Sequence, residues 1–168
     1  EKEEQEEQEE TNSPFQLPLG IREATDNDWD TIWALELAHR EYVDKTSFCP
    51  DFQSVCLLEK SVLEKMMRGR MSSKAWKVLL CNDDAIIMGN IRKQGAIDVG
   101  YIKELFVKET ARRSGVGTVL LETLMSWFTA KGITYVTLSV IDNNPVAVNF
   151  YEKHGFRTYV QAMVKKTS

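Results

Sequence analysis

The chain has few of the residues that build disulfide frameworks and metal sites. Its 168 residues include three cysteines and two histidines. Cys49, Cys56 and Cys81 are an odd number at spacings that match no common zinc motif, and the first two would stand about two helical turns apart, beyond disulfide reach. With only His39 and His154 beside them, the sequence predicts free thiols, no metal site and no Cys–His nucleophile.

Long apolar runs and a strong basic surplus are also missing. No stretch approaches the ~18 apolar residues of a membrane-spanning helix, and EKEEQEEQEE at the start is the opposite of a signal peptide. The net charge is −4, but seven Glu and one Lys in residues 1–10 carry −6, which leaves +2 on the remainder. We expect a cytoplasmic protein without membrane or nucleic-acid partners, with a mobile acidic tail and linker over 1–18 and one domain over 19–168.

The apolar periodicity predicts an α/β (α+β) domain with a mixed, mostly antiparallel central sheet flanked by helices. Thr25 or Asp26 is a candidate N-cap for the first helix, and the residues near Gly100 could accommodate a bulge. The run 133–141 is almost continuously apolar, as in a strand buried on both faces. Helical spacing covers 25–43, 52–68, 115–131 and 144–154, and β-rich runs cover 20–25, two segments of 74–95 joined at 82–84, 97–108, 133–141 and 156–165.

Residues 111–124, ARRSGVGTVLLETL, place a polar, glycine-containing loop directly before a helix. The first N–H groups of a helix lack partners and attract anions, and Gly115 and Gly117 let a ligand approach the backbone closely. Arg112 and Arg113 add positive charge. This segment has three alternative interpretations: a helix start without function, a nucleotide-binding loop, or a binding site for another polyphosphate. The nucleotide loop fits worst, because the Lys of a Walker motif and the third glycine of a Rossmann motif are missing.

A second motif lies about 30 residues further on. NNPVAVNFYEKHGF places Asn144, Ala147 and Tyr151 on one helix face. Together, R-x-x-G-x-G and N-x-x-A-x-x-F-Y-E-K-x-G-F resemble the GNAT superfamily of acetyl-CoA-dependent N-acetyltransferases. The resemblance covers about residues 97 to 157 by motif, and about 20 to 164 by element order. One departure is the pair Arg113–Ser114, where many members have Gly after the first Arg.

The resemblance implies that acetyl-CoA is the co-substrate and indicates where it binds. Its pantetheine would lie where the strand before the loop diverges from the next strand, and its pyrophosphate would lie on the N–H groups of residues 112 to 118. Asn144 would contact the coenzyme or only cap its helix. The implied coenzyme-binding residues are Leu105, Phe106, Val107, Arg112, Arg113, Ser114, Gly115, Val116, Gly117, Thr118 and Asn144.

The same resemblance implies two catalytic residues. Tyr151 matches a tyrosine that many relatives place beside the CoA sulfur, and Glu104 matches an acidic residue that serves as base or water organiser. Core packing of Tyr151 and a salt-bridged Glu104 are the structural alternatives, and Tyr101 and Asp98 are weaker candidates for the base. A base is needed because an amine with a pKa near ~10 is mostly protonated at neutral pH.

The expected reaction moves an acetyl group from acetyl-CoA to a primary amine of a small molecule, peptide or protein, by direct attack in a ternary complex. The alternative is a CoA-binding regulatory or interaction module of the same fold without turnover. The acceptor is not defined, because the aromatic residues that could line its pocket could equally fill the core, and a homodimer is left open. These aromatic residues are Trp29, Trp33, Tyr42, Phe48 and Phe52.

Overall fold

The computed structural model describes residues 17–18, 20–47, 59–141, 143–165 and 167. The acidic run of residues 1–10 therefore lies outside the described residues. So does the segment 48–58, which contains the predicted start of the second helix and also Cys49, Cys56, Phe48 and Phe52.

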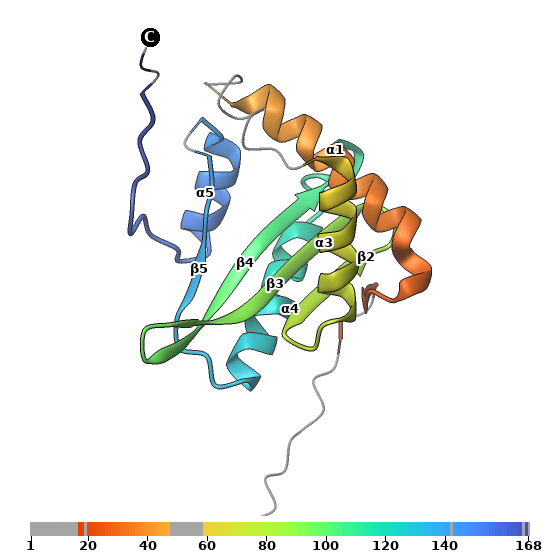
Figure 1. The fold of residues 1–168 in the computed structure, drawn as a ribbon, viewed down its shortest axis with the longest axis horizontal. Coiled ribbons are helices and arrows are strands. Elements are labelled where there is room, and N and C mark those ends of the chain that lie inside the picture. The colour runs from red at the N-terminus through yellow and green to blue at the C-terminus, as the bar shows by residue number, and fades with distance from the viewer. Residues whose placement is uncertain (1–16, 19, 48–58, 142, 166, 168) are drawn as a thin grey trace, which may run out of the picture.

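Five strands form one sheet in the order β1-β2-β3-β4-β5 (Figure 1). Neighbouring strands are antiparallel except β4 and β5, which are parallel. This confirms the predicted mixed, mostly antiparallel sheet. The strands are β1 Ile21–Glu23, β2 Trp76–Cys81, β3 Ala85–Gln94, β4 Ile97–Val107 and β5 Val136–Leu138.

Helices cover both faces of the sheet, with α1 and α3 on one face and α4 on the other (Figure 1). Because side chains alternate along a strand, neighbours such as Leu79 and Leu80 belong to different core clusters. Leu79 packs with the α4 cluster and Leu80 with the α1–α3 cluster. The helices are α1 Trp29–Thr46, α3 Lys60–Ser72, α4 Val116–Ala130 and α5 Pro145–Lys153, with 3₁₀ turns η1 Asp26–Asp28 and η2 Glu109–Ala111.

A bulge in β4 changes which face its residues occupy. Met88 of β3 pairs with Glu104 and Gly89 pairs with Ile102, so Lys103 is the extra residue. Ile102 therefore packs in the α4 cluster while Glu104 faces α1, although residues two apart in a regular strand share a face. The sequence suggested a bulge near Gly100, and the extra residue lies three positions further on. Gly100 itself makes room for Phe128, whose ring atoms would lie 2.9 Å from a Cβ at position 100.

Of the two strands predicted near the C-terminus, one is present but shorter and less buried than expected, and the other is absent. Within 133–141 only Val136–Leu138 forms a strand, and it lies at the sheet edge, with Tyr135 63% exposed instead of buried. The run 156–165 contains no strand. A β-forming composition becomes a strand only where a partner strand supplies hydrogen bonds, and residues 157–165 have no such partner in the described part of the chain.

Candidate active site

The parallel pairing of β4 and β5 stops in the middle of β4. Its last pair is Ile102 with Leu138, immediately before the bulge at Lys103, and β4 then continues to Val107 paired only with β3. Among the described residues, the other edge of 103–107 has no strand beside it. This is the divergence that was implied for Leu105, Phe106 and Val107.

The start of α4 leaves several N–H groups without acceptors. Gly115 is the N-cap, with φ at +86°, and the first bond between successive turns runs from the Val119 N–H to the Gly115 carbonyl, at 3.1 Å. The N–H groups of residues 116–118 therefore come before Val119, the first residue whose N–H donates within the helix, and no N-cap side chain accepts from them. A Cβ on Gly117 would come no closer than 3.6 Å to the protein, so internal packing does not require glycine there.

Arg112 connects the loop to the rest of the site. Its Nε donates to the Val107 carbonyl at 3.0 Å, and its guanidinium lies 4.7 Å from the centre of the Tyr42 ring. The Arg112 N–H already donates to Glu109, so this amide of the predicted anion loop is occupied. Arg113 is exposed and has an unusual positive φ of 62°.

Asn144 joins α5 to α1. Its side-chain oxygen accepts the Ala147 N–H at 3.2 Å, which confirms the cap interpretation. The same oxygen accepts the Tyr42 hydroxyl at 3.2 Å. Asn144, Tyr42 and Arg112 thus form a continuous link between the ends of α5, α1 and β4.

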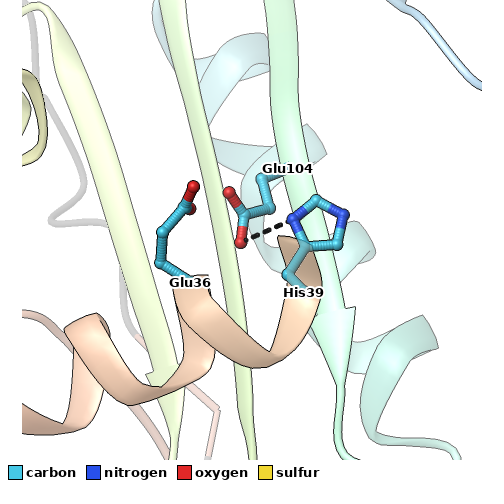
Figure 2. A group of neighbouring side chains, drawn as sticks. All are labelled: Glu36, His39 and Glu104. Carbon is cyan, nitrogen blue, oxygen red and sulfur yellow. Dashed lines mark ion pairs between the residues drawn. The ribbon is translucent and has the colours of Figure 1, made fainter. Parts of the chain in front are cut away.

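Glu36, His39 and Glu104 converge between α1 and the sheet (Figure 2). Nδ1 of His39 lies 3.1 Å from Oε1 of Glu104, an ion-pair distance that does not meet hydrogen-bond geometry. Both glutamates are only 6% exposed, and Oε2 of Glu36 and Oε1 of Glu104 are buried without hydrogen-bond partners among the described residues. The His39 side chain is 25% exposed, so it is the member of the group that reaches solvent.

Glu36 and Glu104 differ in protonation state. Burial, followed by the Glu104 carboxylate, raises the pKa of Glu36 to about 8. Burial opposes ionisation of Glu104 as well, but the adjacent His39 and then Glu36 hold the pKa of Glu104 below its usual value. At neutral pH the pair therefore carries one proton, located mainly on Glu36, and one negative charge on Glu104. The donor atoms of all three residues lie within 4.8 Å of one another, a spacing that one divalent cation could also bridge.

Tyr151 on α5 completes the group of candidate residues. Its ring packs edge-on against Phe150 and Phe156, with centroids 5.3 and 5.7 Å away. Burial, followed by the Glu104 charge, raises the pKa of Tyr151 to about 12. Within the described residues its hydroxyl makes no hydrogen bond, so it can donate one to a ligand.

The other candidates lie elsewhere. Asp98 pairs with Lys93 at 3.0 Å, and Tyr101 lies beneath the Arg92 guanidinium, 4.0 Å from its ring centre. His154 follows the end of α5 and contacts the Phe150 carbonyl through Nδ1 at 2.7 Å. Trp29 and Trp33 stack on each other, half-buried, at 5.5 Å, beside the α1–α3 core cluster. Cys81 is a half-buried free thiol, as expected.

Sequence reasoning missed Glu36. The signal was present, because Glu36 follows Ile32 by four residues and precedes His39 by three, and so falls in the buried stripe of α1. A charged residue inside such a stripe is rarely buried without a partner.

No helix in the described part of the chain is long and apolar enough to cross a membrane.

Comparisons with known proteins agree with this geometry. The model of the Acetyltransferase (GNAT) family matches residues 58–156. N-alpha-acetyltransferase 60 of Drosophila melanogaster is 39% identical over 62 residues, which are 35% of this chain and 22% of that protein. L-ornithine N5-acetyltransferase NATA1 of Arabidopsis thaliana is 37% identical over 59 residues, which are 35% of this chain and 26% of that protein. The chain thus matches about a quarter of each relative's length.

Solved structures share the fold. The tetramutant of the BH1408 protein from Bacillus halodurans superposes with a TM-score of 0.74 at 23% identity, covering 88% of this chain and 99% of that one. An aminoglycoside antibiotic 6'-N-acetyltransferase from Acinetobacter haemolyticus gives 0.65 at 16% identity, covering 88% and 97%. The family model spans more than half of the sequence. The chain is therefore a member of the GNAT acetyltransferase family.

Proposed function

We propose that the protein transfers an acetyl group from acetyl-CoA to a primary amine of a small molecule or a peptide, by direct attack in a ternary complex. The proposal rests on the end of β4–β5 pairing at Ile102. Beyond that residue one edge of β4 is unpaired, and this part of the strand includes the buried Glu104. A coenzyme that carries amides at one end and phosphates at the other fits such a combination.

The described residues suit acetyl-CoA. The unpaired edge at Leu105, Phe106 and Val107 would bind the pantetheine amides, and the free N–H groups at the start of α4 would bind the pyrophosphate. Exposed Arg113 and Ser114 would flank the phosphates, while Arg112 and Asn144 hold the surrounding elements in place. When bound, acetyl-CoA supplies a thioester whose carbonyl carbon the amine attacks and whose thiol leaves.

His39 and Glu104 would together remove the proton that an ammonium substrate must lose before it can attack. Glu104 was the predicted base, but at 6% exposure it is too buried to meet a substrate itself. We assign the direct contact to His39, with the Glu104 carboxylate 3.1 Å away stabilising the positive charge that His39 gains. The overall reaction yields an N-acetyl product, a thiol and one proton, and the partly exposed His39 ring returns that proton to solvent.

Tyr151 would act on the leaving sulfur as a hydrogen-bond donor. A pKa of about 12 keeps its hydroxyl protonated at all physiological pH values. A thiolate of ordinary pKa, near ~8.5, is too weak a base to take that proton, so Tyr151 stabilises the sulfur without being ionised. The second proton of the attacking nitrogen then neutralises the thiolate.

The test is thiol release from acetyl-CoA with a panel of amines: polyamines, amino acids that include ornithine, an aminoglycoside, and peptides with free N-termini. We expect release that depends on one class of amine, with the N-acetyl product identified by mass spectrometry. Thermal stabilisation by CoA without thiol release from any amine would instead support a binding module without turnover.

The assigned roles need their own variants. His39→Gln and Glu104→Gln should each lower kcat by about 10²–10³-fold, the usual effect of losing a general base, while His154→Gln is the matched histidine control and should not. A chelator should leave the rate unchanged. If the chelator abolishes activity and a divalent cation restores it, the three residues hold a metal and the proton route is wrong.

A further inference from the structure

The buried carboxyl groups beside His39 have more acceptor atoms than the protein supplies with donors. Oε2 of Glu36 and Oε1 of Glu104 have no hydrogen-bond partner among the described residues, and each residue is only 6% exposed. A buried carboxyl oxygen in this state has lost its water without compensation, which is costly. The 3.1 Å approach of the His39 Nδ1 atom does not remove this cost, because it lacks hydrogen-bond geometry. Two such oxygens in one place indicate a position for a positively charged ligand.

The three side chains are arranged as metal ligands commonly are. Glu36 and His39 lie three positions apart in α1, so the helix places them on the same face. Helices use this Glu-x-x-His spacing to give two ligands to one metal ion. Glu104 adds a third side chain from β4, and Figure 2 shows its carboxylate between Glu36 and His39. One donor atom of each residue lies within 4.8 Å of the other two, so small side-chain rotations would bring all three onto one ion.

The types of ligand favour Zn²⁺. This ion binds imidazole nitrogen and carboxylate oxygen at about 2.0–2.2 Å in a tetrahedron, which separates two ligand atoms by about 3.4 Å. The 3.1 Å between Nδ1 of His39 and Oε1 of Glu104 is already close to that separation. Two carboxylates and a neutral imidazole also balance the two charges of the ion, so the buried site would carry no net charge. The His39 side chain is 25% exposed, which gives the ion a path from solvent.

We propose that Glu36, His39 and Glu104 bind one Zn²⁺ ion, and that the bound ion stops acetyl transfer. The second part rests on the proposed function. A His39 ring that binds zinc through Nδ1 keeps its other nitrogen protonated, so it cannot accept a proton from the substrate, and the ion also neutralises Glu104. The cysteine and histidine spacings predicted no metal site, because two of these three ligands are carboxylates.

Equilibrium dialysis of chelator-treated protein against Zn²⁺ tests the site without using activity. The parent protein should bind about one zinc ion per chain. Glu36→Gln should weaken binding by more than the ~10–100-fold that follows the loss of a group behind the ligands. Glu41→Gln, on the exposed side of the same helix, and His154→Gln are the matched controls and should bind zinc like the parent. Zinc should also raise the melting temperature of the parent but not that of Glu36→Gln.

Inhibition is measured separately, by mass spectrometry of the N-acetyl product, because free zinc would also bind the released thiol. The rate should fall with an inhibition constant equal to the Kd from dialysis and should recover when a chelator is added. Mg²⁺ should not inhibit, since it prefers sites whose ligands are all oxygen.

Three results would overturn the proposal or part of it. A parent protein that binds no zinc, or zinc binding that survives both Glu36→Gln and His39→Gln, would refute the site. Zinc bound at these residues without a fall in rate would refute the inhibition. If no amine is acetylated under any condition, the proposed function fails, whereas dialysis still decides whether the site exists.

Discussion

Replacing Glu36 by Gln should stabilise the protein at neutral pH. The folded protein raises the pKa of Glu36 from 4.5 to about 8, so folding favours its protonated form. Below pH 4.5 Glu36 is protonated in both the folded and the unfolded chain, so it does not lower the free energy of unfolding. Between pH 4.5 and 8 the free energy of unfolding falls, because Glu36 releases its proton in the unfolded chain but keeps it in the folded one. Stability is thus lost as the pH rises towards the folded pKa.

The size of the effect follows from that shift. At 1.36 kcal/mol per pH unit, ionisation of the unfolded chain removes about 3 kcal/mol of stability by pH 7 and about 5 kcal/mol above pH 8. Glutamine has the shape of the protonated acid and can donate its N–H to Glu104, but it has no proton to lose. Glu36→Gln should therefore match the parent protein at pH 4.5 and exceed its free energy of unfolding by about 3 kcal/mol at pH 7.

Urea denaturation at pH 4.5, 7 and 8.5 measures this difference, and comparing the two proteins at each pH cancels the titration of groups that do not interact with Glu36. Glu41→Gln is the control on the same helix, since Glu41 is exposed and pairs only with Lys45. If the stabilities of the parent and Glu36→Gln run parallel across this range, Glu36 is not held protonated, and the description of the pair is wrong.

Three further substitutions test the candidate site and the packing of the elements around it. Tyr151→Phe should lower kcat while leaving the Kd for CoA almost unchanged, as measured by steady-state kinetics and calorimetry; equal losses of both would remove its assigned role. Gly115→Ala should cost about 1–2 kcal/mol of stability, because φ is +86° there, and should weaken CoA binding; an unchanged melting temperature would contradict the strained cap. Gly100→Ala should cost about 1–3 kcal/mol in urea denaturation, because the new Cβ meets the Phe128 ring, whereas the exposed Gly69→Ala should not destabilise α3.

Local signals in the sequence were enough to predict most of the architecture. The α4 helix was expected over 115–131 and spans Val116–Ala130, because its apolar residues repeat at helical spacing and glycines flank it. The hairpin around residues 82–84 and the α5 cap at Asn144 were likewise predicted from short motifs. Each of these features is determined by residues within a few positions of one another.

Features that depend on distant partners were not predictable in this way. Glu36 and Glu104 are 68 positions apart, and only the packing of α1 on the sheet brings them together. The run 133–141 reads as a central strand, yet its exposure is set by which strand lies beyond it. The contacts of Arg112 with the Val107 carbonyl and with the Tyr42 ring likewise depend on elements distant in the sequence.

The extra residue Lys103 has a consequence for protein engineering. Deleting it would restore a regular β4, in which Ile102 and Glu104 become neighbours and so keep their opposite faces. The hydrophobic interior and the acid–histidine contact would survive, but the strand would lose the bend with which it leaves β5. Deletion of Lys103 therefore offers a control in which the course of β4 beside β5 is changed while every other side chain of the candidate site is kept.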